Sequence, residues 1–204
     1  MSLTLGDFER DQIKEVINIG GGNASTSLSR LIGKPVFLGV PQLFLDRIEK
    51  TVSHFSSPQE TSTAVLLNTR PAGGPLMLFL LPHDSADYLV QILGAWDKKK
   101  PGLSTDLARS SLAEAGNILG GAFLDSLSSF LELDFVQSVP EVVRDMTGSI
   151  IDSIVSPLGM HSEEILVCSA DFRVENSPIQ GQFYFIFSPE STLRILEKTH
   201  SKIS

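Results

Sequence analysis

Hydrophobic and small residues recur every three or four positions in two long stretches of the chain. In residues 6–32 the recurring positions are Ile13, Ile17, Gly20, Ala24, Leu28 and Leu31. In residues 108–127 they are Ala108, Leu112, Ala115, Leu119, Phe123 and Leu127. This spacing places the side chains on one face of a helix. We therefore predict two long amphipathic helices.

Shorter segments between and after these helices have the composition of strands. They are rich in Val, Ile, Leu and Phe, are bounded by Pro, Gly or Ser, and cover residues 36–40, 64–69, 75–81, 134–138, 163–173 and 179–187. Residues 71–75 and 177–178 predict hairpin turns. A proline in the first turn predicts a helix over 83–96 and another over 189–200. Residues 141–155 predict one further amphipathic helix, on which Asp145 and Asp152 are polar candidates. The expected fold class is α+β, or mixed α/β.

The two halves of the chain repeat the same pattern at an offset of 99 residues. A gapless alignment of residues 11–41 with 110–140 pairs identical residues, among them Glu15 with Glu114 and Asn18 with Asn117. Toward the end of each half the offset grows to 107, so the second half carries about eight extra residues. We predict one domain over residues 1–204, made of two repeats (6–100 and 101–204) related by pseudo-twofold symmetry. In each repeat a long helix is followed by strands and a further helix.

Composition and charge narrow the choice of partners and compartment. The 204 residues are 42% hydrophobic and 20% charged, which is typical of a compact globular protein. Sixteen Lys and Arg against 24 Asp and Glu give a net charge of −8, which argues against a nucleic-acid partner. No apolar run approaches the ~18 residues of a membrane span, and the N-terminus has no apolar signal segment. The single cysteine, Cys168, lies in an apolar run and is expected to be buried. We expect a cytoplasmic protein without a membrane contact.

Each long helix also carries a polar stripe. Asp11, Glu15 and Asn18 follow one another at steps of four and three, so their side chains share one helix face. Ser110, Glu114 and Asn117 repeat this spacing. Glycines follow each stripe, and each costs about 1 kcal/mol in a helix interior relative to Ala. A solvated face with close internal packing would explain a single stripe. The same Glu and Asn in two diverged copies favour a functional surface.

The spacing of these residues carries a family resemblance. Asp or Ser, three residues, Glu, two residues, Asn, twenty-two residues and Pro fit both Asp11 to Pro41 and Ser110 to Pro140. This pattern resembles the CheC/FliY/CheX family of chemotaxis phosphatases, and two copies in a chain of this length resemble its CheC-type members. The resemblance implies a single CheC-like domain that hydrolyses the aspartyl phosphate of a CheY-type response regulator.

The resemblance also implies a role for each residue of the stripes. Asn18 and Asn117 would orient the attacking water, and Glu15 and Glu114 would pair with a lysine of the regulator. Asp11 and Ser110 would contact the regulator at the edge of the footprint. The regulator would supply Mg²⁺, so no cofactor is expected on this chain. Because each Glu has its own Asn, two separate sites explain the pattern better than one shared acid–base pair.

Other kinds of site fit poorly, and one alternative function stays open. The four histidines are scattered without metal-ligand spacing, and neither a nucleophile elbow nor a P-loop is present, so no metal site is expected. The alternative that the resemblance implies is a non-catalytic module that sequesters the phosphorylated regulator or regulates a CheD-like receptor deamidase. The surface we favour for that partner is the helix predicted at 141–155, with Asp145 and Asp152.

Overall fold

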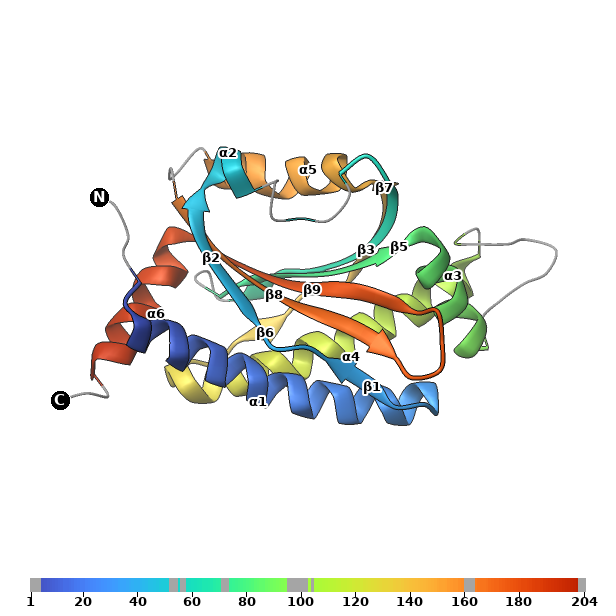
Figure 1. Ribbon diagram of the computed structural model, residues 1–204, viewed down its shortest axis with the longest axis horizontal. Coiled ribbons are helices and arrows are strands. Elements are labelled where there is room, and N and C mark those ends of the chain that lie inside the picture. The colour runs from blue at the N-terminus through green and yellow to red at the C-terminus, as the bar shows by residue number, and fades with distance from the viewer. Residues whose placement is uncertain are drawn as a thin grey trace.

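A seven-stranded antiparallel sheet lies between two layers of helices (Figure 1), and residues 69–70 and 136–137 form a separate two-stranded sheet. The computed structural model describes residues 5–51, 55, 58–70, 74–94, 103, 105–159 and 164–201. The helices are α1 (Asp7–Ile32), α2 (Ile48–Thr51), α3 (His83–Ile92), α4 (Asp106–Leu131), α5 (Thr147–Gly159) and α6 (Pro189–Ser201). The strands are β1 (Val36–Leu38), β2 (Gln42–Arg47), β3 (Thr61–Leu67), β4 (Thr69–Arg70), β5 (Leu76–Pro82), β6 (Val136–Gln137), β7 (Glu141–Met146), β8 (Glu164–Val174) and β9 (Gln180–Phe187).

Most of the predicted elements are confirmed. The two long helices are α1 and α4, and the last helix of each half is α3 or α6. The six predicted strands overlap β1, β3, β5, β6, β8 and β9, although β3 begins three residues before its predicted start. The helix expected over 83–96 ends at Ile92, and positions 95 and 96 lie outside the described residues. Positions 71–73 of the first predicted turn also lie outside them. The strand β2 and the short helix α2 were not predicted.

The single helix predicted over 141–155 is wrong. Residues 141–146 form β7, which pairs with β3, and the helix α5 starts only at Thr147. Along β7 the half-buried residues alternate, as Val142 and Arg144 do, which is the period of a strand. The apolar residues of this segment also fit a helical spacing, and pairing with a distant strand decides between the two.

The strands of the two halves are exchanged in the sheet. Its order is β1-β8-β9-β5-β3-β7, with β2 also paired to β8. In the first half Arg47 of β2 lies opposite Glu164 of the second half. Met146 of β7, 99 positions after Arg47, lies opposite Thr61 of the first half. This equivalence confirms the expected α+β class with an internal duplication. The repeat limits 6–100 and 101–204 stay a prediction, since residues 100 and 101 lie outside the described part.

Identical serines join the long helix to the next strand in each half. Ser29 Oγ accepts a hydrogen bond from the backbone N–H of Val36 at 2.9 Å, and Ser128 Oγ accepts one from Phe135 at 3.2 Å. Each long helix then ends in a left-handed residue, Gly33 or Glu132. The repeated serines therefore have a structural role.

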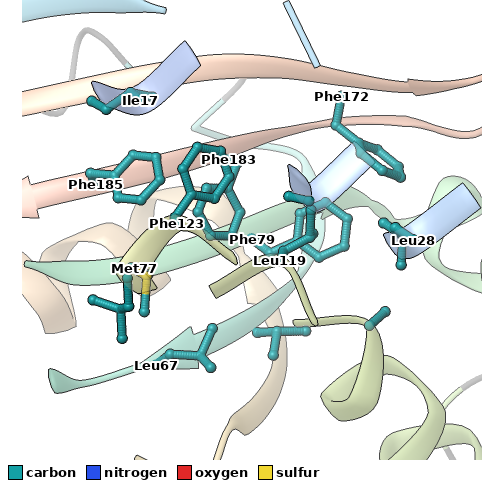
Figure 2. Close-up of a cluster of buried hydrophobic side chains, with 14 of the residues drawn as sticks. Ile17, Leu28, Leu67, Met77, Phe79, Leu119, Phe123, Phe172, Phe183 and Phe185 are labelled. Carbon is teal, nitrogen blue, oxygen red and sulfur yellow. The ribbon is translucent and has the colours of Figure 1, made fainter. Parts of the chain in front are cut away.

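Each face of the sheet buries its own hydrophobic cluster. The helices α1, α3, α4 and α6 cover one face, where Phe123 of α4 stacks on Phe183 with ring centroids 5.1 Å apart (Figure 2). On the other face, which α5 covers (Figure 1), Ile151 and Ile154 of α5 belong to a second buried cluster that includes Tyr184. The hydrophobic and small positions predicted for the two long helices are buried except Leu31, which is 40% exposed, whereas its neighbour Ile32 is buried. The long helices are thus fixed against the sheet, with their polar stripes turned outward.

Candidate functional site

The stripe on α1 is an open polar surface. Asp11, Glu15 and Asn18 are all exposed, while Ile13 and Ile17 on the opposite side of the helix are buried. Within the described part of the chain, these three polar side chains make no hydrogen bond or ion pair. The first repeat therefore presents a carboxylate and, one turn later, a carboxamide, both available to a partner.

A glycine continues this surface, and another explains how α1 packs. A Cβ placed on Gly22, one turn beyond Asn18, would meet nothing within 4 Å. A Cβ on Gly20 would lie 2.7 Å from Cδ1 and 3.0 Å from Cα of Phe123. Gly20 therefore lies in the kind of close internal packing that the sequence analysis considered, and the approaching element is α4 of the same chain.

The stripe on α4 differs from the stripe on α1. Ser110 and Glu114 are exposed, but Asn117 is only half-exposed. Gln137 of β6 donates a hydrogen bond from Nε2 to the main-chain oxygen of Asn117 at 3.1 Å, and the same nitrogen lies 3.3 Å from Asn117 Oδ1. Sequence reasoning missed Gln137 because the first repeat has Leu38 at this position.

The two stripes do not form one site. Figure 1 shows α1 running from left to right and α4 from right to left, and they touch where Gly20 meets Phe123. Because the helices are antiparallel, Asn117, which precedes Phe123, lies beside the part of α1 that follows Gly20. Asn18, which precedes Gly20, lies on the other side of this contact. The structure thus presents one Glu and Asn pair per repeat.

Asp145 and Asp152 do not lie on the two helices that carry the stripes. Asp145 is the next-to-last residue of β7, and its Oδ1 accepts a hydrogen bond from the backbone N–H of Met146 at 2.7 Å. Asp46, its counterpart in the first repeat, makes the same contact with Arg47 at 2.8 Å. Asp152 is exposed on α5, which covers the opposite face of the sheet from α1 and α4 (Figure 1). The two residues therefore belong to different elements, and Asp145 has a local structural role.

The other features of the described residues either lie apart from the stripes or lack the chemistry of a catalytic or metal site. A groove of about 750 Å³ opens between β1, β8, β9 and β5, lined by Asp171, Arg173 and Gln182 among others, and no stripe residue lines it. Burial raises the pKa of the Cys168 thiol, which leaves it unsuited to act as a nucleophile. Among the residues described, no three His, Cys, Asp or Glu side chains gather as a metal site requires. No described helix has the length and apolar character needed to cross a bilayer.

Comparison with known proteins connects these features to chemotaxis proteins. A model of the CheC-like family matches residues 107–144, which include the stripe on α4 and Gln137. The chain is 28% identical over 161 residues to the CheY-P phosphatase CheC of Bacillus subtilis, covering 78% of this chain and 77% of that protein. It is 24% identical over 182 residues to CheC1 of Halobacterium salinarum, covering 89% and 91% of the two chains.

A solved structure shares the fold. The crystal structure of Thermotoga maritima FliY superposes with a TM-score of 0.74 at 21% sequence identity, over 98% of this chain and 100% of that chain. The arrangement of exchanged strands and paired long helices is therefore a known architecture.

Proposed function

Because this chain belongs to the CheC-like family, we propose that it is a phosphatase that hydrolyses the aspartyl phosphate of a CheY-type response regulator in chemotaxis signalling. The observation that carries this proposal is the duplicated pair of an exposed glutamate and, one turn later, an asparagine on α1 and on α4. The name of the Bacillus subtilis relative, a CheY-P phosphatase, supports the choice of substrate.

The chemistry asks little of the phosphatase beyond orientation of water. Phosphoryl transfer passes through a loose transition state, in which positioning and electrostatic stabilisation dominate. A carboxamide offers both a donor and an acceptor, so Asn18 or Asn117 can hold a water in line with the phosphorus without taking its proton. In this proposal the regulator holds the Mg²⁺ that neutralises the developing charge.

The glutamates serve to dock the regulator. Glu15 and Glu114 are exposed, and within the described part of the chain neither forms an ion pair. Each is therefore free to pair with a lysine of the regulator and so fix the asparagine over the phosphoryl group. Asp11 and Ser110, one turn earlier, would lie at the edge of this contact.

Turnover is the property that tests the proposal. With a tenfold excess of phosphorylated regulator over this protein, we expect phosphate release to continue through many equivalents. Replacement of either asparagine, Asn18→Ala or Asn117→Ala, should lower the rate at its own site by roughly 10²–10³, the cost of losing one preorganised polar contact. The double variant should approach the hydrolysis rate of the regulator alone.

The matched control is Gln91→Ala, which removes an exposed carboxamide from α3, outside both stripes. It should leave the rate unchanged, and all these surface variants should keep the free energy of unfolding within about 0.5 kcal/mol. A burst of one equivalent followed by the intrinsic decay of the regulator would contradict hydrolysis and favour sequestration. Full activity in the double asparagine variant would show that the water is oriented elsewhere.

A further inference from the structure

The two candidate sites differ in what surrounds the asparagine. Asn117 is contacted by Gln137, whose Nε2 lies 3.1 Å from its main-chain oxygen and 3.3 Å from its Oδ1. Asn18 makes no hydrogen bond through its side chain within the described residues. At the place equivalent to Gln137, the first repeat has Leu38, whose Cδ1 would lie 3.8 Å from a Cβ on Gly21.

Packing alone does not explain a glutamine at position 137. Its Oε1 is buried and has no hydrogen-bond partner among the described residues, an arrangement that disfavours folding. Leu38 fills the equivalent position in the first repeat without a polar group. A leucine would therefore also suit the second repeat if only the core mattered.

The helix also leaves room for the amide of Gln137. A Cβ on Gly120 would lie 2.7 Å from Gln137 Oε1, and a Cβ on Gly121 would lie 3.8 Å from Gln137 Nε2. Glycine at position 120 therefore allows the glutamine side chain to lie against α4 beside Asn117. The contact with Gln137 therefore explains the glycine at position 120, whereas the crossing of the two long helices explains Gly20.

We propose that Gln137 is a positioning residue of the second site, which holds the carboxamide of Asn117 in the orientation that aligns the attacking water. This inference rests on the proposed function. With Nε2 of Gln137 donating to Oδ1, the amide of Asn117 cannot turn freely, and its Nδ2 hydrogens remain available to a water or a phosphoryl oxygen. The two sites are then unequal, because only the second has an asparagine oriented before the regulator binds.

The test isolates the second site in an Asn18→Ala background. Gln137→Met keeps the length of the side chain and removes its donor, and Gln137→Leu installs the residue of the first repeat. For each variant we expect kcat to fall about tenfold, since misplacement of a reacting group by about 1 Å costs up to about 10² in rate. The KM for the phosphorylated regulator should stay constant, because Glu114 on the surface is unchanged. Gln91→Leu, an exposed glutamine on α3, is the matched control and should change neither constant.

A second measurement does not depend on activity. In the free protein, the NMR order parameter of the Asn117 side-chain amide should exceed that of Asn18, and it should fall to the level of Asn18 in Gln137→Met. An order parameter that does not change, or an unchanged kcat in both Gln137 variants while the parent turns over, would overturn the role of Gln137. Absence of turnover in the unmodified protein together with the expected amide response would instead refute the proposed function and leave the positioning of Asn117 supported.

Discussion

Two glycines of α1, separated by a single residue, should respond in opposite ways to the same substitution. Gly22 is exposed, and a Cβ there meets nothing within 4 Å. Gly22→Ala therefore adds only the helix propensity of alanine and should raise the free energy of unfolding by about 0.5–1 kcal/mol.

Gly20→Ala gains the same propensity but introduces a clash. Its Cβ would lie 2.7 Å from Cδ1 and 3.0 Å from Cα of Phe123, closer than the 3.4 Å at which ordinary contacts begin. Phe123 cannot move away easily, because its ring stacks on Phe183 at 5.1 Å and meets the edge of Phe185 at 4.5 Å. Overpacking of this kind costs typically about 1–3 kcal/mol. After the gain in propensity, we expect a net loss of about 1 kcal/mol.

Urea unfolding measures both effects on one scale. The two variants should differ by about 2 kcal/mol, which separates their midpoints by about 1 M if the slope is about 2 kcal/mol/M. Phe123→Leu in the Gly20→Ala background should recover part of the loss, so a double-mutant cycle should show favourable coupling between the two changes. Equal stability of Gly20→Ala and Gly22→Ala would refute the close approach of α4 to α1.

Two further predictions concern the thiol and an ion pair. Because burial raises the pKa of the Cys168 thiol and removes it from solvent, a disulfide reagent at mildly alkaline pH should not react with the native protein but should react fully in denaturant; rapid reaction of the native protein would contradict this. Arg144→Met removes a partly buried pair in which Nη2 lies 2.6 Å from Oδ1 of Asp87, and it should lower the free energy of unfolding by about 2 kcal/mol in urea titrations. Arg194→Met, which breaks the more exposed pair with Glu190, is the control and should cost at most about 0.5 kcal/mol; equal losses would show that burial does not strengthen the first pair.

Local periodicity was sufficient for the elements whose structure depends on their own residues. The buried faces of α1 and α4 could be predicted because burial on one face of a long helix repeats at a fixed step. The prediction that Leu31 is the last buried position of α1 was wrong. Ile32 is buried instead, and steps of three and four residues are both compatible with a helix. Among the elements that were missed, the strands β2 and β7 pair with strands of the other half. Their conformation depends on partners far away in the sequence, which no local pattern contains.

The residues of the candidate site also divide into those that the sequence predicts and one that only the fold reveals. Glu15, Asn18, Glu114 and Asn117 were identified because the duplication repeats them. Gln137 breaks the duplication, and its contact with Asn117 exists only once β6 is placed against α4. A residue that belongs to one copy alone leaves no signal in a comparison of the two copies.

The exchange of β2 and β7 makes the chain a tethered dimer of its own repeats. Neither repeat contains the hydrogen-bond partners of all its strands. The strand β2 of the first repeat pairs with β8 of the second, and β7 of the second repeat pairs with β3 of the first. Two separate copies would close such a sheet only by association, and their stability would then depend on concentration. The covalent connection makes that association intramolecular, so the sheet stays closed at any dilution. Because every molecule contains one first repeat and one second repeat, the two repeats can differ in sequence, as they do at the equivalent positions Leu38 and Gln137.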